Sequence, residues 1–314
     1  MYYVTADGGG TKLIAILYDE NFNILSVGRA GGTNLNFRSL EDIRADMKKA
    51  AEECAGGKTD QIESADFVIV GPKEEFTTAL SGAAKLKNHT VLNEGQAALM
   101  AGTGEKYGLL ALAGTGSDVF LLQSDHNDFI GGWGSVLGDE GGGFDVGMQS
   151  LRAAIYAEDG RGEKTLLLPL IKEEWKLDKL WDMVEKVYHT NDQRRLVASV
   201  TRVTAKAAAM GDEIALELYR KAAYEIWRLT RVVLEKNNGH IEGKICTSGG
   251  VWKGSPVMYE EYVRLVKNEF PDAEIVKPVF DPCIGGMVWR AIERGIKKEE
   301  YWPLLLKNCS EFRY

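Results

Sequence analysis

The chain has 314 residues, 45% of them hydrophobic and 27% charged, a composition typical of a soluble globular protein with room for two domains. Its formal net charge is −8 and no basic stripe runs along it, so neither nucleic acid nor an anionic membrane is an expected partner. The first residues are not expected to form a secretory signal, because Asp7 interrupts the first apolar run. The sequence shows no apolar stretch of membrane-spanning length and no Cys-x-x-Cys pair. We expect a cytoplasmic protein with free thiols, without a disulfide, zinc or iron–sulfur framework.

The first elements are predicted to form an antiparallel meander of three strands, at 2–6, 13–18 and 24–27. The run Asp7-Gly8-Gly9-Gly10-Thr11-Lys12 lies at the tip of the first hairpin. Glycines at a tip let backbone N–H groups approach an oxyanion, Thr11 adds a hydroxyl, and Asp7 can hold a divalent cation directly or through water. The run therefore predicts a phosphate-binding turn, with an ordinary glycine turn as the alternative.

The meander is followed by alternating helices and strands. Ser39 is expected to cap a helix that ends near Cys54, and further elements follow as a strand at 67–70, a helix at 73–86 and a strand at 90–92. That last strand delivers Asn93 and Glu94 to the start of a helix at 96–101.

The pattern then restarts with a second apolar hairpin, 109–113 and 119–122, around the turn Gly114-Thr115-Gly116. Beyond it we expect strand 129–130, a glycine-rich block at 131–143, helices over 145–236, strand 244–247, a helix from 257, strand 274–276 and a last helix at 284–295.

The repeat predicts one domain at 1–104 and another at 105–314, the latter with a helical insertion at about 145–237. The last helix could return to the first domain. Domains of this kind leave a cleft in which ligands bind.

Four segments, in this order, carry a family resemblance: Asp7 to Lys12, Leu112-Ala113-Gly114-Thr115-Gly116-Ser117, Gly131-Gly132-Trp133-Gly134 through Gly138-Asp139-Glu140-Gly141, and Thr247-Ser248-Gly249-Gly250-Val251-Trp252-Lys253. The chain resembles the sugar-kinase, actin and heat-shock-chaperone ATPase superfamily, and within it the N-acetylglucosamine kinase group of the BadF/BadG/BcrA/BcrD ATPase family. The resemblance implies an α/β fold of two actin-like (ribonuclease H-like) domains flanking a nucleotide cleft, with a helical insertion in the second.

The resemblance also implies roles for residues. ATP would bind a first turn of Gly9, Gly10, Thr11 and Lys12, a second turn of Gly114, Thr115 and Gly116, and an adenosine turn of Gly249 and Gly250. Asp7 would organise Mg²⁺, and an amino sugar would bind at Asn34, Gly132, Trp133 and Asp139. A homodimer is the family-based expectation.

The chain departs from the family at Glu94, where the family usually has Asn-Asp-Ala or Thr-Asp-Ala and the aspartate is the presumed base for the sugar hydroxyl. Glu94 keeps the carboxylate but is one methylene longer, and Gly95 gives the longer side chain room. We therefore predict a sugar kinase with Glu94 as general base, acting at the primary hydroxyl. The alternatives are a catalytically weakened sugar-binding or sensing protein and an ATPase that activates another enzyme. The latter would need cluster-binding cysteines that the spacing here does not offer.

Overall fold

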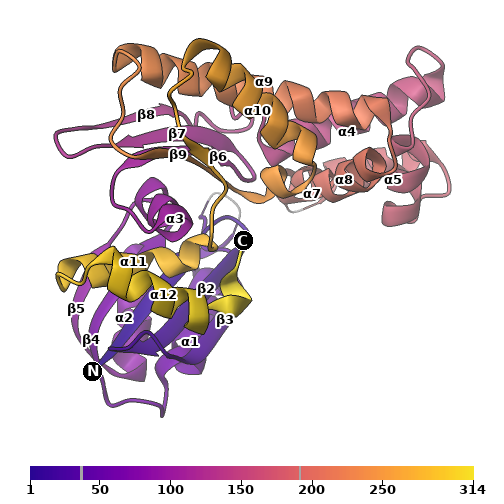
Figure 1. The fold of residues 1–314 in the computed structure, drawn as a ribbon. Coiled ribbons are helices and arrows are strands. Elements are labelled where there is room, and N and C mark those ends of the chain that lie inside the picture. Colours follow the sequence, from indigo (N-terminus) through magenta and orange to yellow (C-terminus); the bar gives the residue numbers. More distant parts are fainter. Residues whose placement is uncertain (36–37, 191) are drawn as a thin grey trace. The chain divides into compact units, whose positions relative to one another are not determined.

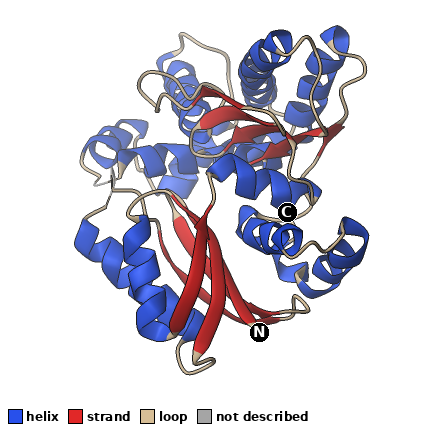
Figure 2. Ribbon diagram, turned by 90° about the vertical axis from the view of Figure 1, so that its left-hand side faces the viewer, coloured by secondary structure: helices blue, strands red, loops and turns tan. Residues whose placement is uncertain are grey.

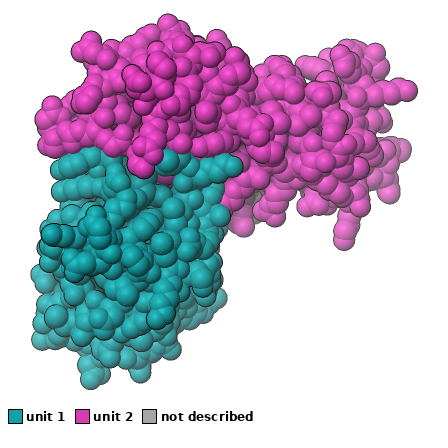
Figure 3. Space-filling model, viewed as in Figure 1, with its two compact units in different colours: residues 1–108, 276–314 teal, residues 109–275 magenta. Residues whose placement is uncertain are grey.

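The structure is a computed structural model that describes residues 1–35, 38–190 and 192–314 (Figure 1). It is built from two five-stranded sheets and the helices that pack on them (Figure 2). The chain divides into two compact units: unit 1 comprises residues 1–108 and 276–314, and unit 2 comprises residues 109–275 (Figure 3). The predicted domains were 1–104 and 105–314, with a possible return of the last helix to the first domain; in the structure residues 276–314 belong to unit 1.

The sheet of unit 1 begins with the predicted meander. Strands β1 (Tyr2–Gly8), β2 (Lys12–Asp19) and β3 (Ile24–Gly31) are antiparallel neighbours. Two further strands, β4 (Gln61–Ile69) and β5 (Lys85–Val91), continue the sheet parallel to β1 in the order β3-β2-β1-β4-β5. The three parallel strands therefore end at the same edge of the sheet.

Both faces of this sheet are covered by helices. Alternate residues of β2 point to opposite faces, so Leu13, Ala15 and Leu17 enter one core and Ile14, Ile16 and Tyr18 enter another. The first core is closed by α1 (Leu40–Ala55) and α2 (Lys73–Ala83). The second is closed by α3 (Glu94–Thr103), α11 (Gly285–Glu293) and α12 (Lys298–Asn308), with short 3-10 segments at Pro282–Ile284 and Ser310–Phe312.

Two local expectations for unit 1 are corrected. Helix α2 ends at Ala83 rather than at Leu86, because residues from Lys85 onward pair with β4 as strand β5. Helix α12 was not predicted, and it contains Pro303, a residue that removes a backbone donor and usually argues against a helix interior. The predicted cap of α1 is confirmed: the Ser39 hydroxyl oxygen accepts a hydrogen bond from the Asp42 N–H at 3.1 Å.

Unit 2 has the strand order β10-β9-β6-β7-β8. The strands are β6 (Gly108–Ala113), β7 (Ser117–Leu122), β8 (Asn127–Gly131), β9 (Lys244–Ser248) and β10 (Ile275–Val276). The helices are α4 (Gly143–Asp159), α5 (Leu167–Trp175), α6 (Met183–Tyr188), α7 (Gln193–Ser199), α8 (Thr201–Ala209), α9 (Glu213–Lys236) and α10 (Pro256–Glu269), with 3-10 segments at Leu180–Asp182 and Gly250–Lys253. One apolar core joins the sheet to these helices.

Among the described residues, no helix is both long enough and apolar enough to cross a membrane.

Candidate functional site

Unit 1 gathers several predicted site residues at one sheet edge. Because β1, β4 and β5 are parallel, their carboxyl ends lie together. The segments that follow them are the turn from Gly9 to Lys12, Gly71, and Asn93 with Glu94. The fold thus brings the first glycine turn and Glu94 to the same edge, where open α/β sheets bind their ligands.

The first glycine turn is closed by backbone hydrogen bonds. The Gly9 N–H donates to the Lys12 carbonyl at 3.0 Å, and the Gly9 carbonyl accepts from the Thr33 N–H at 2.8 Å. A β carbon added at Gly9 or Gly10 would meet no atom within 4 Å, and neither residue has a positive φ. Neither backbone conformation nor packing therefore requires glycine here, and the empty space beside the turn suits the approach of a ligand.

Asn34 lies beside this turn through its neighbour Thr33. The Thr33 hydroxyl donates to the Val70 carbonyl at 3.0 Å. A β carbon on Gly71, whose φ is +139°, would lie 2.1 Å from the Thr33 carbonyl oxygen, so glycine is needed for this approach. The hydrogen bonds of Thr33 to the Gly9 and Val70 carbonyls therefore hold its neighbour, the half-buried Asn34, next to the turn.

Asp7 lies at the end of the central strand β1, and it is half-buried. Burial raises the pKa of its carboxyl to about 6; the positive charge of Lys12 opposes this rise, and the negative charge of Asp281 adds to it. Asp281, just before the 3-10 segment at Pro282–Ile284, was not among the predicted site residues. Two carboxylates next to a phosphate-type turn form a location that favours a cation.

Glu94 is the first residue of α3, and its side chain is exposed. The preceding Asn93 has a structural role: its side chain accepts from the Gln96 N–H at 2.8 Å, and the Gln96 side chain accepts from the Asn93 N–H at 3.0 Å. A carboxylate in the first turn of a helix is stabilised by the helix dipole. The capping box therefore fixes where α3 begins, and with it the position of the exposed Glu94.

In unit 2, three glycine segments meet at the second turn. The Gly114 carbonyl accepts from the Gly143 N–H at 2.8 Å, and the Thr115 carbonyl accepts from the Phe144 N–H at 2.9 Å. Gly249 has a φ of +108°, and a β carbon there would lie 2.2 Å from the Ala113 carbonyl oxygen. The start of α4 and the end of β9 therefore both pack against the turn.

The glycines around the second turn fall into two groups. Gly249 is required by its conformation and its packing, as described above. In contrast, β carbons on Gly114 and Gly250 would meet nothing within 4 Å, and neither residue has a positive φ. As at Gly9 and Gly10, the space beside these two glycines is not occupied by other protein atoms.

The glycine-rich block between β8 and α4 is rich in left-handed backbone. Gly131, Gly132, Gly134 and Gly141 all have φ between +69° and +95°, which explains why glycine occupies them. Trp133 lies between two of them and is 75% exposed, so it is not a core residue.

Asp139 is placed differently from a simple ligand-facing residue. It is 4% exposed and has a φ of +58°. Its Oδ1 accepts from the Gly134 N–H at 3.0 Å, and its Oδ2 accepts from Nη2 of Arg194 at 2.8 Å. Both carboxylate oxygens are thus already bonded within unit 2. Arg194 was missed by the sequence analysis, since nothing in a helical stretch marks one arginine among several.

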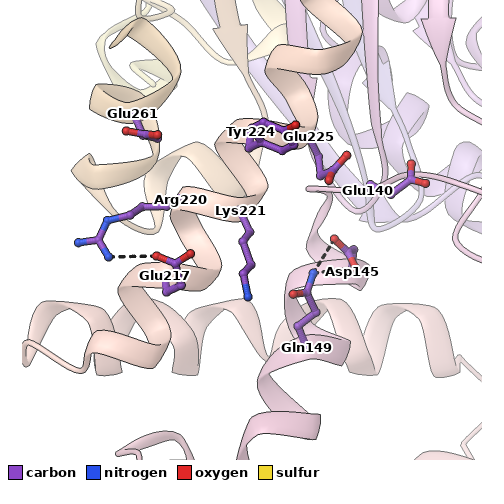
Figure 4. Close-up of a pocket in the computed structure, with 9 residues that line it drawn as sticks. All are labelled: Glu140, Asp145, Gln149, Glu217, Arg220, Lys221, Tyr224, Glu225 and Glu261. Carbon is purple, nitrogen blue, oxygen red and sulfur yellow. Dashed lines mark hydrogen bonds and ion pairs between the residues drawn. The ribbon is translucent and has the colours of Figure 1, made fainter. Parts of the chain in front are cut away.

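A cavity of about 610 Å³ lies elsewhere on unit 2, among α4, α9 and α10 (Figure 4). Its lining is mostly charged: Glu140, Asp145, Gln149, Glu217, Arg220, Lys221, Tyr224, Glu225 and Glu261. None of the predicted site residues lines it, so this cavity is separate from the glycine turns.

The order and spacing of the glycine turns match one known family. Residues 6–289 match the BadF/BadG/BcrA/BcrD ATPase family. The chain belongs to this family. The resemblance stated from four sequence segments is therefore confirmed.

Members of the family and proteins of the same fold resemble the chain over most of its length. The N-acetylmuramic acid/N-acetylglucosamine kinase of Clostridium acetobutylicum is 26% identical, over 91% of this chain and 97% of its own. The N-acetyl-D-glucosamine kinase of Dictyostelium discoideum is 25% identical, over 90% of this chain and 95% of its own length. The crystal structure of a protein from Porphyromonas gingivalis, described as a putative N-acetylglucosamine kinase, has a TM-score of 0.71 at 18% identity. The match covers 94% of this chain and 100% of that one. The predicted fold class, α/β of the actin-like sugar-kinase type, is confirmed.

Proposed function

We propose that the chain transfers the terminal phosphoryl group of ATP to the primary hydroxyl of an amino sugar or an N-acetylated amino sugar. The observation that carries the proposal is the open space at Gly9, Gly10 and Gly114, where neither packing nor a positive φ requires glycine. The names of the two curated relatives support the amino-sugar class.

ATP is the donor in this proposal, and both glycine turns bind its phosphates through backbone N–H groups. The first turn comprises Gly9 to Lys12, and the second comprises Gly114 to Gly116. Gly249 and Gly250 contact the adenosine. Backbone donors in fixed turns need no reorganisation as charge develops on the phosphoryl oxygens, so they stabilise the transition state.

Magnesium fits the donor set beside the first turn. The described residues contain no group of three or more His, Cys, Asp or Glu side chains that could enclose a metal. Mg²⁺ usually needs no such cage, because one or two carboxylates, water and substrate phosphates complete its shell. Asp7 would hold the ion directly or through water, and the bound ion supplies positive charge to the phosphates.

Glu94 is the general base in the proposal. Its carboxylate accepts the proton of the attacking sugar hydroxyl, the new bond forms between that oxygen and the terminal phosphorus, and the bond to the ADP oxygen breaks. The exposed position at the sheet edge of unit 1 leaves Glu94 accessible to a substrate. The extra methylene relative to aspartate shifts the carboxylate by roughly one ångström, which Gly95 accommodates.

The sugar ligands of the proposal are Asn34, Gly132, Trp133 and Asp139. Asn34 offers an amide for hydroxyl or acetamido groups, and the exposed indole of Trp133 can cover an apolar ring face. Gly132 leaves its backbone accessible, with a φ of +69°. Direct sugar binding by Asp139 stays a prediction, since its oxygens already accept two hydrogen bonds.

An ADP-release screen tests the proposal. The purified chain is incubated with ATP and Mg²⁺ and a panel of glucosamine, N-acetylglucosamine, N-acetylmannosamine, N-acetylmuramic acid and glucose. We expect sugar-dependent ADP release with at least one amino sugar, well above release with no sugar, and mass spectrometry should find the product phosphorylated at the primary hydroxyl. Absence of sugar-dependent release across the panel would contradict the kinase.

Glu94 itself favours a second candidate, a sugar-binding protein with weakened transfer. Calorimetry with the same panel separates the two functions. Sugar binding without any ADP release supports the sensor, whereas sugar binding with ADP release supports the kinase. The oligomeric state, expected to be a homodimer, stays a prediction that light scattering can test.

A further inference from the structure

An ion pair between Asp139 and Arg194 joins the glycine-rich block to the helices of unit 2. The Arg194 Nη2 donates to the Asp139 Oδ2 at 2.8 Å, and the two side chains are 22% and 4% exposed. The other oxygen of Asp139 accepts from the Gly134 N–H at 3.0 Å, next to Trp133. The carboxylate therefore links α7 to the part of the loop that carries Trp133.

The same ion pair lies against the second glycine turn. A β carbon at Gly116 would be 2.2 Å from the Asp139 Oδ2 and 2.8 Å from the Arg194 Nη2. Gly116 is thus needed for the approach of the pair, in contrast to the open Gly114. One charged contact touches both the turn and the loop.

The helix that carries Arg194 has a firm position. A β carbon on Gly147 of α4 would lie 2.1 Å from the Val197 carbonyl oxygen of α7, so the two helices are in close contact. The first N–H groups of α4, from Gly143 and Phe144, donate to the carbonyls of the second turn. The turn, α4, α7, the ion pair and the loop therefore form a closed chain of contacts within unit 2.

Asp139 needs this support for two physical reasons. Its backbone is left-handed, a conformation that non-glycine residues keep only where their surroundings impose it. Its carboxylate is buried, and a buried charge that loses its partner is strongly destabilised. Removing the cation should therefore release the loop before it unfolds the unit.

We propose that Arg194 is a positioning residue for the phosphoryl transfer: by holding Asp139 against the second turn, it fixes the conformation of the loop from Gly131 to Gly141, which carries Trp133. The kinetic part of this inference rests on the proposed function. The structural part, that Arg194 fixes the loop, does not.

Hydrogen exchange of the backbone amides tests the structural part on the full-length chain. In Arg194→Gln we expect exchange in residues 131–141 to rise at least about tenfold, with less than about twofold change in β2 and α9. Arg194→Lys, which keeps the charge, should stay within about threefold of wild type. Arg195→Gln, an exposed neighbour on the same helix, is the control and should leave exchange in 131–141 unchanged.

A double variant tests whether the two charges act together. Asp139→Asn keeps an acceptor for the Gly134 N–H and tolerates left-handed backbone, so Asp139→Asn with Arg194→Gln should exchange more slowly in 131–141 than Arg194→Gln alone. The inference is overturned if exchange in 131–141 is the same in Arg194→Gln as in Arg195→Gln, or if Arg194→Gln raises exchange in α9 as much as in 131–141. It is also overturned if the rise in exchange in the double variant is the sum of the rises in the two single variants.

Steady-state kinetics tests the functional part. Arg194→Gln should raise the KM for the amino sugar at least about tenfold and reduce kcat less, because the loop and not the reacting groups is displaced. An unchanged KM would overturn the role in transfer. If the wild-type chain releases no ADP with any amino sugar, the proposed function fails, and the exchange experiment alone decides whether Arg194 fixes the loop.

Discussion

The two glycine turns use similar residues but are supported in different ways. The turn of unit 1 is held by Thr33 and by the loop at Val70 and Gly71. The nearby side chains of Asp7, Asn34 and Glu94 are half-buried or exposed. The turn of unit 2 is held by the start of α4, by Gly249 and by a buried ion pair. The side chains near the first turn are therefore accessible, whereas the second turn depends on packing at particular positions. Substitution of an exposed side chain of unit 1 such as Glu94 should have little effect on stability, whereas substitution of a packed glycine of unit 2 such as Gly249 should lower it.

The largest expected effect on rate is at Glu94 in unit 1. Glu94→Gln should lower kcat by about 100-fold or more, because an amide cannot accept the proton of the attacking hydroxyl. Sugar affinity should stay within about threefold and the melting temperature should be unchanged, because the side chain is exposed. Kinetics and thermal unfolding measured on the same preparation check this. Unchanged turnover would remove Glu94 from the mechanism, and a large loss of stability would break the contrast between the units.

The largest expected effect on stability is at the turn of unit 2. Gly249→Ala places a β carbon 2.2 Å from the Ala113 carbonyl oxygen at a φ of +108°. It should lower the free energy of unfolding by about 2–4 kcal/mol, as backbone strain combined with a clash does elsewhere.

The adjacent Gly250 is the matched control for that change. A β carbon there meets no atom within 4 Å, so Gly250→Ala should change stability by less than about 0.5 kcal/mol. Urea unfolding of both variants measures the difference. Equal stability of the two would show that packing does not support this turn.

These contrasts also show what the sequence could and could not predict. The meander, the Ser39 cap and both glycine turns were predicted, because turn glycines and apolar strands are local signals. Helix α12, which contains Pro303, was not predicted, and α2 was predicted too long because Lys85 and Leu86 form a strand only through pairing with β4.

The support of the second turn could not be predicted for a similar reason. Arg194 lies 55 residues from Asp139 along the chain, so nothing local marks the pair. Asp139 was predicted as a sugar ligand from its place in the glycine block, and its burial and its bonds to Gly134 and Arg194 appear only in the folded unit. The open space beside Gly9, Gly10 and Gly114 likewise appears only in the folded chain, because it depends on which atoms pack around each glycine.

The smallest expected effect concerns Asp7, where a substitution should stabilise the protein, whereas most substitutions destabilise. Burial raises the pKa of this carboxyl to about 6 in the folded chain, above its ordinary value of 3.8. The group therefore favours the folded state when protonated, and that contribution is lost as the pH rises through about 6.

Asp7→Asn, which resembles the protonated form, should stabilise the protein without ATP or Mg²⁺ by about 1–2 kcal/mol at pH 7.5, a value discounted for the partial exposure of the side chain. The gain should shrink toward zero below about pH 4, where wild-type Asp7 is itself protonated in both states. Thermal unfolding across this pH range checks the sign. A variant less stable than wild type at pH 7.5 would contradict the assignment of Asp7 as a half-buried carboxylate whose charge destabilises the folded state.

The central claim is that the open glycines of the first and second turns bind the phosphates of ATP. Titration calorimetry with Mg²⁺ and a non-hydrolysable ATP analogue tests it on wild type, Gly10→Ala and Gly114→Ala, since neither added methyl group meets a protein atom within 4 Å. We predict one nucleotide per chain and a loss of at least about tenfold in affinity for each variant, with unfolding free energies within about 0.5 kcal/mol of wild type. Wild-type affinity in either variant, or two independent nucleotides per chain, would contradict the account.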